Sequence, residues 1–175
     1  MAQIANGKII YMNCGNDCYR FCMENGSWTR SIVGFLYNEN EEADSRIMFH
    51  LMRIPSPNQV IIRTNDTDVV ILTLHFLKSL SPEVLVWLDI GIENHRRYLS
   101  ANQLCTHLGP YLCEALVGLT GSDYTASFSW KGKVNPFKKL VGDVVAQIAF
   151  AQLGSTLELS PETARTIEIF LCKVY

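Results

Sequence analysis

The sequence lacks the features that mark membrane-spanning, secreted and repetitive proteins. No apolar run approaches the roughly 20 residues that a helix needs to cross a bilayer. The N-terminal residues have neither the basic start nor the apolar block of a signal peptide. No internal repeat and no low-complexity tract is present. These absences predict a soluble intracellular protein with no membrane partner.

The sequence also lacks a strong net charge. It has 15 Lys and Arg residues against 17 Asp and Glu residues, which gives a net charge of −2 at pH 7. No global positive field attracts nucleic acid, so such binding would need a local basic patch. Hydrophobic residues make up 48% of the chain, enough for a buried core, and this composition excludes intrinsic disorder. The length of 175 residues predicts a single domain.

The six cysteines are expected to be reduced, because the chain has no secretory feature. Cys14, Cys18 and Cys22 recur every four residues, and in a strand this even spacing predicts one shared, buried face. A zinc site would need a second Cys-x-x-Cys pair or a matching pair of histidines, so core thiols are favoured over zinc ligands. The same interpretation covers Cys105, His107 and Cys113.

The N-terminal part of the chain is predicted to be rich in β-structure. Residues 8–23 predict a hairpin whose turn is Asn13-Cys-Gly-Asn-Asp17. Asn25-Gly26 predicts another turn, and residues 32–37 predict a short apolar strand. Asn40 is predicted to cap a helix, because its acidic first turn at residues 41–44 suits the helix dipole.

After this helix, strands and helices are predicted to alternate. Strands are expected at 60–63 and 84–90, and helices at 69–80, 101–108, 110–119, 135–153 and from 161 onward. Ser100 and Ser160 are the expected N-caps of two of these helices. The alternation predicts an α/β fold with helices on the faces of a sheet. In such sheets ligands bind beyond the carboxyl ends of the strands.

Five carboxylates follow the predicted elements at places where such a site could form. They are Glu42, Asp44, Asp66, Asp68 and Asp123. Gathering them without a cation would be costly, because like charges raise one another's pKa values. All-oxygen ligands suit Mg²⁺ or Mn²⁺, and two such ions can activate water for phosphodiester hydrolysis. Each acid has an alternative role, as a helix-dipole partner, an Asx-turn residue, a helix cap or a loop residue.

Three of these segments resemble the flap endonuclease family of structure-specific nucleases, within the wider PIN-like fold. They are Glu42-Ala-Asp44, Thr64-Asn-Asp-Thr-Asp68 and Leu119-Thr-Gly-Ser-Asp-Tyr124. The intervening Arg97-Tyr-Leu-Ser100 looks like the family's approach to its last metal ligand. The resemblance implies that the five acids are metal ligands and that the chain adopts a three-layer sandwich around a mainly parallel sheet. It also implies an N-terminal β-hairpin and a C-terminal helix-turn-helix region.

A closer resemblance is to uncharacterised, transposon-derived animal proteins, and it covers residues 8–175. The shared motifs are Glu41-Glu-Ala-Asp44, Asp66-Thr-Asp-Val69, Leu119-Thr-Gly-Ser-Asp123 and Lys131-Gly-Lys133. This resemblance implies one domain with a β-rich part (1–38), an acidic core (39–123) and a helical backbone-binding part (124–175).

The sequence departs from the flap endonuclease pattern in two places. That family has two aspartates on strands before its Glu-Ala-Glu motif, whereas Asp17 is the only aspartate before Glu42 here. This difference leaves one metal site short of its expected ligands and predicts a truncated domain, as does the abrupt end at Tyr175. Trp130 stands where the related proteins have glycine before Lys-Gly-Lys, so the turn that grips the nucleic-acid backbone is expected to be altered.

One local basic patch lies between residues 124 and 142. Its members are Lys131, Gly132, Lys133, Lys138 and Lys139, with no acidic residue among them. Glycine lets the backbone approach a phosphate, and helix amides can bind it. The patch predicts sequence-independent contacts to nucleic acid, with DNA favoured over RNA. The alternative is a solvated helix face.

These observations predict a nuclease-like domain that depends on Mg²⁺ or Mn²⁺ and hydrolyses DNA or RNA, with the nucleus favoured over the cytoplasm. Two alternatives stay open. One is a catalytically degenerate, transposon-derived module that binds nucleic acid or protein. The other is a structural domain whose acids cap helices.

Overall fold

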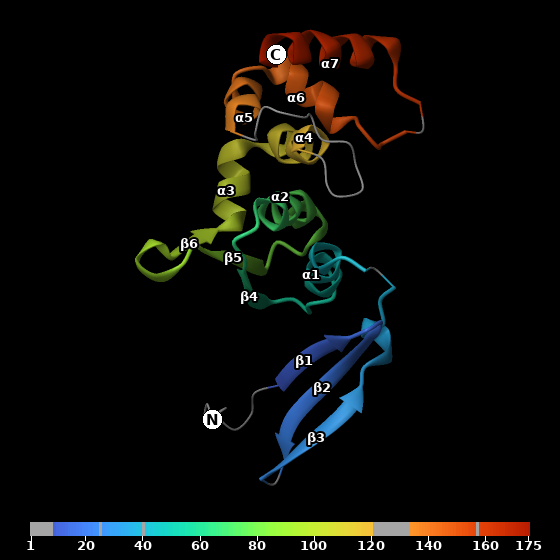
Figure 1. Ribbon diagram of the computed structural model, residues 1–175, viewed down its shortest axis with the longest axis vertical. Coiled ribbons are helices and arrows are strands. Elements are labelled where there is room, and N and C mark those ends of the chain that lie inside the picture. Colours follow the sequence, from blue (N-terminus) through green and yellow to red (C-terminus); the bar gives the residue numbers. More distant parts are fainter. Residues whose placement is uncertain (1–8, 25, 40, 121–133, 157) are drawn as a thin grey trace. The chain divides into compact units, whose positions relative to one another are not determined.

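The computed structural model describes residues 9–24, 26–39, 41–120, 134–156 and 158–175. Within these ranges the chain forms seven α-helices and two three-stranded sheets (Figure 1). Contacts divide it into two compact units, Met1–Arg53 and Ile54–Tyr175, each with one of the sheets. The α/β class predicted from the sequence is confirmed. The PIN-like sandwich and the mainly parallel sheet stay predictions.

The sheet of the first unit is an antiparallel meander. Strand β1 (Ile9–Cys14) pairs with β2 (Asp17–Glu24), which pairs in turn with β3 (Ser27–Ile32). Gly15, at φ +58°, occupies the first turn, and Gly26, at φ +78°, occupies the second. Positive φ is the conformation that glycine adopts without a Cβ penalty, so both turns form where the sequence predicts them.

The two faces of this sheet differ in their exposure. Cys18 and Cys22 are buried on one face. Met12, Trp28 and Ile32 lie on the other face, where each is about half exposed or more. The prediction that Cys14 shares the buried face is wrong. Cys14 lies in β1 opposite Asp17, so it points away from the face of Cys18 and is exposed.

The strand predicted at residues 32–37, directly after this sheet, is also wrong. β3 ends at Ile32, and Gly34–Leu36 forms the 3₁₀-helix η1. Its backbone closes local bonds, Leu36 N–H to Val33 C=O at 2.9 Å and Tyr37 N–H to Gly34 C=O at 3.1 Å. These local bonds take the place of pairing with a neighbouring strand.

The first α-helix, α1 (Ala43–Leu51), has Glu42 as its N-cap in place of the predicted Asn40. Asn40 itself lies outside the described residues. The first turn of α1 contains Asp44, which suits the helix dipole, and Met48 and Leu51 are buried.

The sheet of the second unit is mixed. Strand β4 (Asn58–Arg63) runs parallel to β5 (Val84–Ile90), and β6 (Arg97–Ser100) runs antiparallel to β5. Side chains alternate along β5, so Val84, Val86 and Leu88 are buried on one face. In Figure 1, helices α2 (Thr67–Phe76) and α3 (Ala101–Leu108) lie between this sheet and the other helices of the same unit.

The other helices of this unit form a second layer of packing. They are α4 (Pro110–Thr120), α5 (Val134–Val141), α6 (Val144–Ala151) and α7 (Pro161–Val174). Short 3₁₀-helices, η2 (Leu77–Ser79) and η3 (Glu93–His95), follow α2 and β5. The single helix predicted at 135–153 is in fact two helices, since the chain breaks at Gly142 and the Asp143 carboxylate accepts the Ala146 N–H at 3.0 Å.

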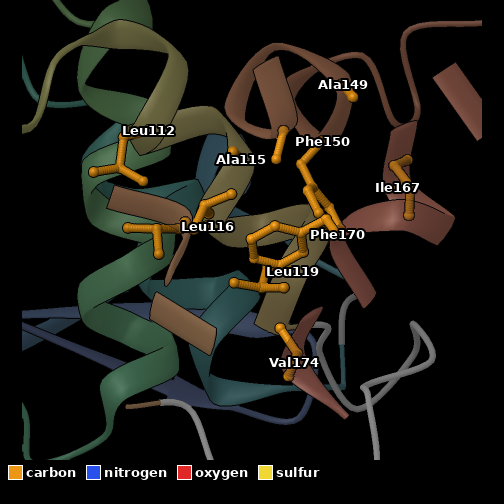
Figure 2. Packing of buried hydrophobic residues seen from close by; sticks show 11 residues of the cluster. Leu112, Ala115, Leu116, Leu119, Ala149, Phe150, Ile167, Phe170 and Val174 are labelled. Carbon is orange, nitrogen blue, oxygen red and sulfur yellow. The ribbon is translucent and has the colours of Figure 1, made fainter. Parts of the chain in front are cut away.

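The apolar core of the second unit is built mainly by α4, α6 and α7. Figure 2 shows Phe150 of α6 and Phe170 of α7 at its centre, with ring centroids 5.4 Å apart and planes at 80°. This edge-to-face arrangement suits the charge distribution of aromatic rings. Leu116 and Leu119 of α4 are buried in the same cluster. The core therefore holds the helices together behind the sheet.

Candidate functional site

Asp66 and Asp68 lie where β4 ends and α2 begins. Asp66 is the N-cap of α2, and its Oδ1 accepts the backbone N–H of Asp68 at 2.8 Å. The N–H of Asp66 donates to the Oγ1 of Thr64 at 3.0 Å. These two bonds fix a tight turn that holds both carboxylates at the N-terminus of one helix. Asp66 is exposed and Asp68 is partly exposed.

The loop after β4 is tied to the turn after β5. The N–H of Thr64 donates to the C=O of Asp89 at 3.1 Å. The N–H of Gly91 donates to the side-chain oxygen of Asn65 at 2.8 Å. Since β4 and β5 are parallel, both segments leave the sheet at the same edge, and the carboxylates of Asp66 and Asp68 lie at this edge. This is the edge at which open α/β sheets bind their ligands.

Gly91 is required by the geometry of the turn. Its φ is +88°, and a Cβ at this position would lie 2.4 Å from the carbonyl oxygen of His95. Both the backbone conformation and the close approach exclude a side chain. The turn that donates the bond to Asn65 therefore depends on glycine.

A third carboxylate, that of Asp89, is buried at the same edge and is held by two arginines. Arg96 donates from Nε to Oδ1 at 2.7 Å and from a terminal nitrogen to Oδ2 at 2.6 Å. Arg63, the neighbour of Asp89 in the β4–β5 register, donates to Oδ2 at 2.8 Å. Arg96 also donates to the hydroxyl of Tyr98 at 2.8 Å. We call Arg63, Asp89 and Arg96 the arginine–aspartate cluster.

The arginine–aspartate cluster keeps Asp89 ionised. The hydrogen bonds from Arg96 lower the pKa of Asp89 to about 2, against the raising effect of burial, and Arg63 adds to the lowering. One carboxylate between two guanidinium groups leaves a net positive charge in the cluster. Its oxygens are already used by arginine, so we do not assign Asp89 as a cation ligand.

Asp89 is not among the predicted site residues, because it lies inside an apolar strand. The sequence holds one signal, a single acid in the run Val84–Ile90 with Arg96 a few residues later. A charged side chain in a buried strand needs a partner. Recognising Arg63 as the second partner required the strand register.

The other three predicted acids belong to other parts of the chain. Glu42 and Asp44 belong to the first unit, as the N-cap and first-turn residue of α1. Asp123 lies outside the described residues. Within the described ranges, no group of three or more His, Cys, Asp or Glu side chains is arranged to hold a metal ion. The meeting of five carboxylates stays a prediction.

The predicted basic patch is described in part. Lys131, Gly132 and Lys133 lie outside the described residues. Lys138 is exposed on α5. The ammonium of Lys139 donates to the C=O of Lys173 near the C-terminus of α7, and Lys173 pairs with Asp143 at 2.8 Å. Lys139 therefore also supports helix packing, because a cation satisfies a terminal carbonyl.

Comparison of the chain with protein-family models, with curated proteins and with solved structures finds no match. Among the helices that the structure describes, none combines the length and the apolar character needed to span a bilayer.

Proposed function

We propose that the chain is a nuclease-like domain that depends on a divalent metal ion and hydrolyses phosphodiester bonds of DNA or RNA. The observation that carries the proposal is the position of Asp66 and Asp68. Both lie at the carboxyl ends of a parallel strand pair and at the start of a helix. Their backbone N–H groups donate to the side-chain oxygens of Thr64 and Asp66, which fixes the turn.

The chemistry of the donors fits a hard cation. Carboxylate oxygens are the ligands that Mg²⁺ and Mn²⁺ prefer. Asp66 and Asp68 would hold the ion together with Glu42, Asp44 and Asp123, directly or through water. When bound, the ion supplies an activated water and stabilises the leaving oxygen of the phosphodiester.

The arginine–aspartate cluster lies at the same edge of the sheet as Asp66 and Asp68. Asp89 anchors Arg63 and Arg96 at the same edge of the sheet. The net positive charge of the cluster would attract an approaching phosphate. Lys131, Gly132, Lys133, Lys138 and Lys139 would hold the nucleic-acid backbone. Such contacts are independent of sequence and weaken as salt rises.

The proposal predicts that Asp66→Asn abolishes metal-dependent cleavage without unfolding the chain. We expect the rate on flap, hairpin and single-stranded substrates in Mn²⁺ to fall by roughly 100-fold or more, because a metal ligand contributes several kcal/mol to the transition state. The amide still accepts the Asp68 N–H, so the cap is kept. Glu168→Gln, an exposed change of the same charge on α7, is the matched control and keeps full activity. Equal cleavage by both variants would reject the proposed role of Asp66.

A second candidate is a catalytically degenerate module that binds nucleic acid without cleaving it. It is favoured by the shortage of aspartates before Glu42, where the flap endonuclease pattern has two. Asp17 is the only one here, and it opens β2 beside a hairpin turn. The two candidates differ in one assay. Salt-sensitive binding of DNA by the full chain, with no cleavage in Mg²⁺ or Mn²⁺, would favour the degenerate module.

A further inference from the structure

Two cysteines meet at the corner between α3 and α4. Cys105 lies in the last turns of α3, and Cys113 lies in the second turn of α4. Gly109, at φ +81°, connects the two helices. The Sγ of Cys113 donates to the Sγ of Cys105 at 3.2 Å. A disulfide bond is about 2.05 Å long, so a shift of little more than 1 Å would bring the sulfurs to bonding distance.

The two thiols differ in their access to solvent. Cys113 is 3% exposed, whereas Cys105 is half-buried. Cys105 lines a cavity of about 530 Å³, whose wall also includes Lys78, Asn102 and Thr106. A cavity of this size accommodates a small molecule. Cys113 also lines this cavity but is almost fully buried, so a reagent in the cavity meets the more exposed Cys105 first.

We propose that Cys105 and Cys113 are a site of reversible thiol–disulfide exchange with a low-molecular-weight disulfide that enters this cavity. The site is separate from the proposed nuclease chemistry and does not depend on it. Its covalent product is a disulfide that joins α3 to α4.

The exchange takes place in two balanced steps. The Cys105 thiol loses its proton, and its sulfur attacks one sulfur of the small disulfide. The S–S bond of the reagent breaks, and one small thiolate leaves and takes up a proton. The Cys113 sulfur then attacks the Cys105 sulfur of the mixed disulfide, and the second small thiolate leaves with the Cys113 proton. The protein pair is oxidised by two electrons and the small disulfide is reduced to two thiols.

The surroundings of the two thiols assign the order of these steps. Burial raises the pKa of Cys113 to about 12, and its hydrogen bond with Cys105 adds to the rise. A buried thiol is a poor nucleophile toward a reagent in solvent. Cys105 is therefore the attacking residue and Cys113 the resolving residue. The mixed disulfide on Cys105 therefore forms first, and the Cys113 sulfur, 3.2 Å away, resolves it.

The experiment treats the full reduced chain with oxidised glutathione, traps free thiols at intervals, and maps the products by mass spectrometry. We expect a glutathione adduct on Cys105, then a Cys105–Cys113 disulfide with the loss of two hydrogens, and full reversal by dithiothreitol. The exposed Cys14 and Cys172 report in the same sample that the reagent is active. Adducts on Cys14 and Cys172 with neither an adduct on Cys105 nor the internal disulfide would overturn the proposal.

Two variants separate the roles of the thiols. Cys113→Ser should hold the adduct on Cys105 without further reaction, and Cys105→Ser should leave Cys113 unmodified over the same time. A glutathione adduct on Cys113 in the Cys105→Ser variant, at the rate seen for Cys105 in the unsubstituted chain, would overturn the assigned order. Mapping of the unsubstituted chain decides the proposal even where a variant does not fold.

Discussion

At the scale of single residues, the arginine–aspartate cluster shows how one buried acid is accommodated in an apolar strand. Asp89 is 2% exposed, and both of its oxygens accept hydrogen bonds from guanidinium groups. A buried carboxylate without partners would have a raised pKa, but here the pKa is lowered to about 2. The folded state therefore binds a proton at Asp89 less readily than the unfolded chain does.

This difference predicts how stability depends on pH. The contribution of Asp89 is fully present above its ordinary pKa of 3.8 and is lost as the pH falls toward about 2. Asp89→Asn should be less stable than the unsubstituted chain at pH 7, and the gap between the two should narrow between pH 4 and pH 2. Urea unfolding of both proteins at several pH values measures this difference in stability. A gap that stays constant down to pH 2 would contradict the lowered pKa.

Gly91 gives a second prediction at this scale. Gly91→Ala should lower the free energy of unfolding by about 2–3 kcal/mol, because it adds a clash with the His95 carbonyl to the cost of a positive φ. Gly154→Ala is the matched control. Gly154 has φ +80°, and an added Cβ there would meet no atom within 4 Å, so this change should cost only about 1 kcal/mol. Equal losses in thermal or urea unfolding would show that the clash is relieved.

At the scale of helices and strands, local signals predicted the boundaries best. Ser100 accepts the Gln103 N–H at 3.3 Å and Ser160 accepts the Thr163 N–H at 3.1 Å, as expected of N-caps. Both helices begin where the sequence predicts. A cap is decided by neighbouring residues, so it can be read without knowing the tertiary structure.

Elements that depend on distant partners were predicted less well. β3 was not predicted, because it is short and mixes polar and apolar residues, with Arg30 between Trp28 and Ile32 on one face. Its pairing with β2 makes it a strand. Beyond Ile32, the last residue of β3, the apolar residues 33–37 form no strand, because local 3₁₀ bonds take up backbone groups there. The pairing of Arg63 with Asp89 likewise depends on the register between β4 and β5, which the spacing of the two residues in the sequence does not reveal.

The packing of α6 gives a prediction at this scale. Phe150→Ala should cost about 3–5 kcal/mol, because it leaves a cavity against Phe170 and the leucines of α4. Val145→Ala on the same helix is the control. Val145 is 67% exposed, so its loss should stay within about 0.5 kcal/mol. Urea unfolding measures the stability of the two variants and of the unsubstituted chain. Similar losses of stability in both variants would contradict the central place of Phe150 in the core.

At the scale of the whole molecule, the chain has two compact units that join between Arg53 and Ile54. Composition and alternation predicted the α/β class, since both follow from the periodicity of apolar residues. The predicted metal site draws on both units, with Glu42 and Asp44 in the first and Asp66 and Asp68 in the second. A sequence can indicate that these acids share one chemistry, but their meeting depends on how distant segments dock. The metal dependence of cleavage tests this prediction for the full chain.

The bond between Asn65 and Gly91 also couples the loop after β4 to the turn that joins β5 to β6. The turn after β5 is bonded directly to the loop that carries Asp66, so the two cannot move apart without breaking it. Substitutions in the turn at residues 91–95 are therefore expected to shift the loop that carries Asp66.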